Sequence, residues 1–224
     1  MSIAEKLTTI AENQQGVYDA GYAKGQAEGE VDTARAASIY RIRDINALQK
    51  SDVTMHFDFL TDFYSFYQDN LTENVTVEHL TIVAKQPSTR INIFMHQSTP
   101  DNKLKHLTLE MDWSKATVSN CFYNLRALEV IDGNPIDLSS STMVGRFFYM
   151  LTSLRHCLFA PSCIKFNADF SDAQYLDEES KQSIVDGLVD LNGETTNTLT
   201  MHRYLALTDE QKATIIGKNW TLVQ

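Results

Sequence analysis

The feature that most constrains the fold is an apolar pattern that recurs along the chain from residue 77 onward. Its four instances are Val77-x-x-Leu80-x-Ile82, Leu104-x-x-Leu107-x-Leu109, Leu125-x-x-Leu128-x-Val130 and Leu151-x-x-Leu154. In the last instance, His156 takes the final apolar position. The central leucines are Leu80, Leu107, Leu128 and Leu154, which follow one another at similar steps. One such string does not indicate a repeat, but four at similar spacing indicate a repeated structural unit.

These steps fall within the range of about 20–29 residues that is typical of leucine-rich repeats. We expect each unit to form a short strand whose alternate apolar side chains point inward, and the stacked units to share one core. The pattern therefore predicts a single buried column made of Leu80, Leu107, Leu128 and Leu154. Strand-like runs at residues 91–94 and 163–166 favour irregular units with additional β-structure.

Helices are expected to close the C-terminal end of the stack. The first is predicted in DEESKQSIVDGLVDLNG, which opens at Asp177 and stops at Gly193. Thr208 and Gln211 form a capping box for the second helix, which is predicted to end at Gly217. Strands are expected on either side of this second helix, in TLTMHRYLAL and NWTL.

Residues 1–30 carry a different pattern, an apolar seam of heptad type. Ser2 and Glu5 form a capping box that opens a helix. A helix of this length is marginal in water on its own, so the seam predicts a partner, and we expect a homotrimer. The oligomerisation residues are Ile3, Leu7, Ile10, Gln14 and Val17. Three glycines at every fourth position weaken the helix that follows, so a frayed tail or hinge is the alternative.

Residues 31–75 are interpreted as a helical and aromatic connector that also caps the N-terminal end of the core. Alanine and isoleucine are frequent in residues 31–50 and no proline interrupts them, which favours a helix. An aromatic stretch follows at residues 57–67. A ligand platform is the alternative there, and we favour a cap. Residues 76–224 then form the repeat domain with its C-terminal cap.

The positions that flank the central leucines are expected to face outward, where repeat proteins often bind partners. This mixed, weakly charged surface consists of His79, Thr81, His106, Thr108, Glu129, Ser153 and Arg155. Because neighbouring strands lie about 4.8 Å apart, the imidazoles of His79 and His106 are expected to stack side by side. We see no third ligand, so these histidines are read as exposed repeat residues and not as a metal site.

Composition excludes several classes of function. With 19 Lys and Arg against 29 Asp and Glu, the net charge is −10, whereas nucleic acid binding needs a basic face. No apolar run reaches about 18 residues, so no membrane-inserted helix is expected. The start, MSIAEKLTTIAENQQ, lacks the pattern of a signal peptide. The three cysteines, Cys121, Cys157 and Cys163, lack metal-binding spacing and are read as small buried residues.

No motif of nucleophilic, metal-dependent or nucleotide-dependent catalysis is legible. The acidic run at residues 177–179 stands at an expected helix start, where negative charge favours the helix dipole. We read it as capping and not as an acid–base pair. The sequence therefore predicts a protein without enzyme activity, cofactor or metal.

Three strings, LEVIDGNPIDLSS, SDAQYLDEESKQSIVDGLVDLNG and TLTMHRYLALTDEQKATIIGKNWTLV, resemble the C-terminal half of BspA-like leucine-rich repeat proteins. The opening EKLTTIAENQQGVYDAGYAKGQAEG resembles the N-terminus of a group of these proteins encoded by phages and prophages of Gram-positive bacteria. The repeats here are few, and the F-x-x-C-x-x-L signature of the family is reduced to FYNL and FYML. The resemblance implies a virion-associated or cell-surface structural protein, often multimeric and without known catalysis.

The expected fold class is α+β, with an N-terminal α-helical stalk before a short, irregular leucine-rich-repeat solenoid that has helical caps. The expected function is that of a phage structural protein of the virion, in a tail, baseplate or head fibre or appendage, assembled in the host cytoplasm. Residues 1–30 would contact other virion proteins, and the repeat domain would bind a host cell-surface protein or glycan. The alternative is a bacterial cell-surface adhesion or protein-interaction module. The missing signal-peptide pattern favours the virion.

Overall fold

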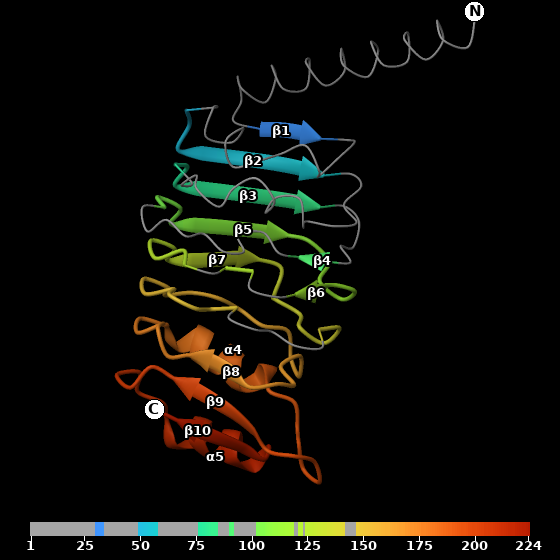
Figure 1. Ribbon diagram of the computed structural model, residues 1–224, viewed down its shortest axis with the longest axis vertical. Helices are drawn as coiled ribbons and strands as arrows, with labels where there is room; N and C mark the ends of the chain where they lie inside the picture. The colour runs from blue at the N-terminus through green and yellow to red at the C-terminus, as the bar shows by residue number, and fades with distance from the viewer. Residues whose placement is uncertain are drawn as a thin grey trace, which may run out of the picture.

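Parallel strands lie one above another along the long axis of the protein, and each comes from a successive coil of the chain (Figure 1). The computed structural model describes residues 30–33, 49–57, 76–84, 90–91, 102–118, 121–122, 124–141 and 147–224. The largest sheet follows chain order and is parallel throughout. Its strands are β1 (Glu30–Thr33), β2 (Asp52–Phe57), β3 (His79–Ala84), β5 (His106–Glu110) and β7 (Val130–Gly133).

The register between neighbouring strands shows that the coils are of nearly equal length. The first Cα pairs of the successive ladders are Glu30 with Thr54, Asp52 with His79, His79 with His106, and His106 with Val130. A parallel bridge between Val130 and His156 extends this ladder by one more coil. Each coil thus returns the chain to the same side of the molecule before the next strand begins.

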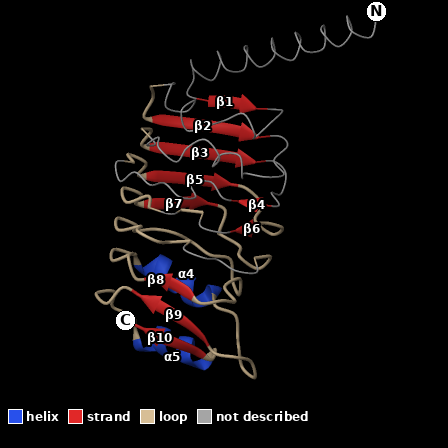
Figure 2. Cartoon of the chain, in the orientation of Figure 1, coloured by secondary structure: helices blue, strands red, loops and turns tan. Residues whose placement is uncertain are grey.

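Shorter parallel pairs join the coils elsewhere. β4 (Arg90–Ile91) pairs with β6 (Thr117–Val118). A three-stranded parallel sheet of order β10-β9-β8 lies toward the C-terminus, built from β8 (Ala168–Phe170), β9 (Asn197–Met201) and β10 (Trp220–Val223). Figure 2 shows the two helices of the described residues, α4 (Glu178–Gly187) and α5 (Asp209–Gly217), beside this sheet.

Alternate residues of the strands point into one continuous core. In β3, Leu80 and Ile82 are buried, while His79 is exposed and Thr81 is half-buried. The four predicted core leucines are all buried, with an exposed fraction of at most 1%. Their arrangement differs from the prediction, because the Cα partner of Leu107 is Ile131.

The predicted column is therefore wrong in its third and fourth members. Leu80 and Leu107 are register partners, but Leu128 precedes Ile131, the register partner of Leu107, by three residues. The sequence pattern predicts that Leu107 lies beside Leu128 on the next coil. The hydrogen-bonded ladder instead pairs Leu107 with Ile131. Leucines occur in both columns, so the spacing of leucines alone does not distinguish the two registers.

The α+β class is also wrong, because the regular elements of the described residues are mostly strands, ten of them against two helices. Part of the expected helical connector, residues 31–75, forms β1 and β2 of the large sheet. In β2 the buried residues Val53 and Met55 alternate with more exposed neighbours, which is a strand period and not a helical one. The expected stalk and its seam lie outside the described residues, except for Glu30, which begins β1.

The starts of both C-terminal helices and the end of α5 were predicted correctly. α5 begins with the Thr208–Gln211 capping box and ends at Gly217. α4 begins after its N-cap Asp177, but it ends at Gly187 and not near Gly193. At Leu188 the backbone becomes extended, and this residue forms a parallel bridge with Ile164.

Within the described ranges, no helix is long and apolar enough to cross a membrane.

Candidate functional site

The outward side of the large sheet carries polar side chains in rows that run from coil to coil. Because the strands are in register, residues at equivalent positions lie beside one another on successive strands. The first row consists of Asp52, His79 and His106, and the second consists of Thr54, Thr81, Thr108 and Asp132. We call these two rows the polar face. Its side chains offer hydrogen-bond donors and acceptors along a regular line.

The first row is held together by specific contacts. Oδ1 of Asp52 lies 2.6 Å from Nδ1 of His79. The rings of His79 and His106 meet edge to face, with centroids 5.8 Å apart and planes at 66°, so they do not stack face to face. Hydrogen bonds from Ser51 and from His79 hold the pKa of the Asp52 carboxyl below its usual value.

The second histidine connects the two rows. Nε2 of His106 is buried, has no hydrogen-bond partner in the part of the chain that the structure describes, and lies 3.6 Å from Oδ2 of Asp132. This distance is too long for a hydrogen bond, so the His106 ring and the Asp132 carboxylate are close neighbours without one. Within the part of the chain that the structure describes, no group of three or more His, Cys, Asp or Glu side chains is arranged to hold a metal ion.

A row of alternating charge borders the polar face where the strands begin. It consists of Glu78, Lys105, Glu129, Arg155 and Asp177, and we call it the ion row. Each of the last four donates its backbone N–H to the carbonyl of the preceding member, at 2.7–2.8 Å. Nζ of Lys105 donates to Oε2 of Glu78 at 2.8 Å, and Nε of Arg155 lies 3.5 Å from Oε2 of Glu129.

These contacts change the pKa values of Glu78, Lys105 and Asp177. The hydrogen bond from Lys105 is the main cause that lowers the pKa of Glu78, and the same bond raises the pKa of Lys105. Burial alone would raise the pKa of Asp177, but hydrogen bonds from Ser180 and from His156 outweigh burial and lower it. The contacts along the ion row therefore favour the ionised forms of Glu78, Lys105 and Asp177.

The structure divides the predicted binding face between three places. All seven residues are exposed or half-buried, as an interaction surface requires. His79, Thr81, His106 and Thr108 lie on the polar face. Glu129 and Arg155 belong to the ion row, and Ser153 lies in the turn that precedes Leu154. The last three were displaced because the predicted register placed Leu128, and not Ile131, beside Leu107.

Sequence reasoning missed the remaining members of the polar face and of the ion row. Asp132 and Lys105 become visible only when Ile131 is aligned with Leu107, because this register places Asp132 beside Thr108. Asp52 and Thr54 were hidden by the helical interpretation of their segment. The alternation of Val53 and Met55 with polar neighbours is the signal that could have identified them.

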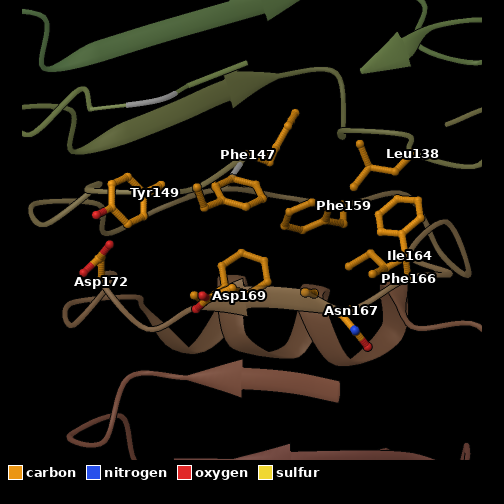
Figure 3. A pocket seen from close by; sticks show the side chains of 12 residues that line it. Leu138, Phe147, Tyr149, Phe159, Ile164, Phe166, Asn167, Asp169 and Asp172 are labelled. Carbon is orange, nitrogen blue, oxygen red and sulfur yellow. The ribbon is translucent and has the colours of Figure 1, made fainter. Parts of the chain in front are cut away.

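A small cavity lies among aromatic rings inside the stack (Figure 3). The ring of Phe148 stacks on that of Phe170 at 4.7 Å, and it meets Phe159 edge to face at 5.6 Å. The cavity has a volume of about 70 Å³, far below the usual ligand-site range of about 300–1,000 Å³. At its margin, the carboxylate of Asp172 already accepts the N–H of Met150. We therefore assign this cavity to core packing.

The expected aromatic cap at residues 57–67 lies outside the described residues, apart from Phe57 in β2.

The three cysteines are buried, as predicted. Sγ of Cys163 donates to the carbonyl of Ile136 at 3.4 Å. Burial raises the pKa of the Cys163 thiol to about 11 and that of Cys157 further. Both thiols are therefore protonated at neutral pH and are poor nucleophiles.

Comparisons of this chain with models of protein families, with curated proteins and with solved structures find no match. The polar face and the ion row are therefore judged on their own chemistry.

Proposed function

We propose that this chain is a non-enzymatic structural protein of a phage particle that binds a partner through the polar face and the ion row. One observation carries the binding part of this proposal, namely that the polar face and the ion row each extend over several successive coils. The inward residues of the same strands are committed to the core, so the outward residues are the ones free to contact a partner.

The chemistry of the two rows suits recognition by many weak contacts. Exposed ion pairs contribute only about 0–1 kcal/mol each, so no single pair would hold a partner. In register, however, Thr81 and Thr108 offer the same hydroxyl group on neighbouring coils, and the ion row offers charges of alternating sign. A cell-surface glycan or an extended protein surface with its own repeat could meet several coils at once. Nucleic acid, a membrane-inserted state and a cofactor are not part of this proposal.

The assignment to a phage particle rests on the resemblance to BspA-like proteins encoded by phages and prophages. In this proposal residues 1–30 attach the protein to other virion proteins and assemble it as a homotrimer. The coils are displayed away from this attachment, because the two ends of the stack, at β1 and β10, lie far apart along its axis (Figure 1).

Particle composition tests this assignment. Antibodies against residues 147–224 are applied to density-purified particles from an induced lysogen, and to washed cells of the uninduced strain. We expect labelling of the particles at a defined position and none of the cells. Labelling of the cell envelope without the particles would instead support the bacterial adhesion module.

A further inference from the structure

A groove lies beyond the carboxyl ends of three strands of the large sheet. Val83 and Ala84 end β3, Glu110 ends β5, and Asn134 directly follows β7. The lining continues over residues 111–114, then over Pro135 and Asp137, and reaches residues 160–161 on the next coil. The groove has a volume of about 500 Å³, within the range of about 300–1,000 Å³ that ligand sites occupy. We call it the acidic groove.

Its charge is of one sign. The described residues that line it include three carboxylates, Glu110, Asp112 and Asp137, and no lysine or arginine. Two of the carboxylates are fixed in place, because the N–H of Ser114 donates to Oδ1 of Asp112 at 2.9 Å and the N–H of Ser139 donates to Oδ1 of Asp137 at 2.8 Å. The hydrogen bonds from the side chain and backbone of Ser114 also lower the pKa of Asp112.

A second and independent observation is an unsatisfied donor in the lining. Trp113 is only 2% exposed, and its Nε1–H has no hydrogen-bond partner among the described residues. Buried indole N–H groups usually have an acceptor, as Trp220 has in the carbonyl of Val189 at 2.9 Å. An acceptor that reaches the indole N–H of Trp113 would satisfy this buried donor.

We propose that the acidic groove binds a short, basic segment of a partner protein in an extended conformation. An extended segment presents lysine or arginine side chains on one face at alternate positions, and backbone carbonyls between them. The cationic groups would pair with the three carboxylates, and one carbonyl would accept the indole N–H of Trp113. Pro135 and Pro161 supply rigid walls for the aliphatic parts of the basic side chains. This site is separate from the polar face and adds a second partner to the proposed function.

Other occupants fit these observations less well. Anionic ligands would be repelled by the three carboxylates. A bare metal ion would need three protein ligands close together, and the described residues hold no such group. A neutral glycan could use the indole donor, but it carries no cationic group to pair with the three carboxylates of the lining.

The test follows the two indole N–H signals of the full-length ¹⁵N-labelled protein, which has two tryptophans. The probe is acetyl-Lys-Ala-Lys-Ala-Lys-amide. We expect a saturable shift of the Trp113 signal, identified with a Trp113→Phe variant, while the Trp220 signal stays in place. Asp137→Asn combined with Glu110→Gln should weaken binding about tenfold, because two charge pairs are lost.

The matched control is Glu179→Gln combined with Glu210→Gln, which removes the same net charge from the exposed ends of α4 and α5. It should change the affinity by less than about twofold, since distant exposed charges are screened by salt. Equal weakening in both double variants, or a Trp113 signal that does not move, would overturn the proposal. Binding of a glucosamine oligomer in place of the peptide would overturn the assignment of the occupant.

Discussion

Gly133 shows how strongly one residue can fix the spacing of the coils. Its φ is +98°, and a Cβ at this position would lie 2.5 Å from the carbonyl oxygen of Leu109 on the coil before. That same carbonyl accepts the N–H of Asn134 at 2.9 Å, so it cannot move away freely. The glycine thus permits the close approach of β5 and β7 in the register that pairs Leu109 with Gly133.

We predict that Gly133→Ala lowers the free energy of unfolding by about 1–3 kcal/mol. The alanine would be strained at this positive φ, and its methyl group would collide with the carbonyl oxygen of Leu109. Urea unfolding followed by circular dichroism measures this change. Gly217→Ala is the control, since an added Cβ there meets nothing within 4 Å. It should change the stability by less than about 0.5 kcal/mol. Similar effects at both positions would contradict this account of Gly133.

The buried thiols give the stability a dependence on alkaline pH. The folded state raises the pKa of Cys163 to about 11 from its ordinary value of 9.0, so it holds the proton more tightly than the unfolded chain. The contribution to stability is therefore complete below pH 9.0 and is lost as the pH rises toward 11. We expect the urea midpoint to fall between about pH 8.5 and about pH 10.5 by less in Cys163→Ala than in the unchanged protein. Parallel curves for the two proteins would show that Cys163 does not contribute.

At the scale of the element, local signals were predictable and non-local ones were not. The capping box of α5 lies within a single helical turn, and its position and partner follow from Thr208 and Gln211 alone. The end of α4 depends on Ile164, which lies on the preceding coil and pairs with Leu188. The register of β7 likewise depends on contacts with β5 that the leucine spacing does not reveal. For this reason the sequence predicted only part of the polar face, and only Glu129 and Arg155 of the ion row.

Burial of the leucines is independent of the column to which each belongs. Leu128 is fully buried, and Leu128→Ala should cost about 2–5 kcal/mol, because the removed atoms leave a cavity between coils. Thermal unfolding measures the loss. Leu222, which is half-buried in β10, provides a control whose truncation to alanine should cost clearly less. A Leu128 variant as stable as the unchanged protein would contradict the stacked core.

At the scale of the whole molecule, assembly is the first open question. The seam of residues 1–30 is too short to be stable as a lone helix, so we predict that it associates as a homotrimer. Light scattering compares the full chain with a chain that begins at Glu30, which keeps β1 intact. The full chain should have the mass of three chains and the shortened one the mass of a single chain. The same number of chains in both would refute the role of this segment.

The whole-molecule claim is that the outward rows bind a partner while the inward residues hold the stack. The most direct measurement is the attachment of the purified full chain to cells of the host bacterium, with Glu129→Lys and Arg155→Glu combined to reverse two members of the ion row. Both side chains are partly or largely exposed, so the free energy of unfolding should change by less than about 0.5 kcal/mol. Glu179→Lys combined with Lys212→Glu is the control, because it reverses one charge of each sign on α4 and α5. The account predicts that attachment falls about tenfold or more in the ion-row variant and is unchanged in the control. Unchanged attachment by the folded ion-row variant would contradict it.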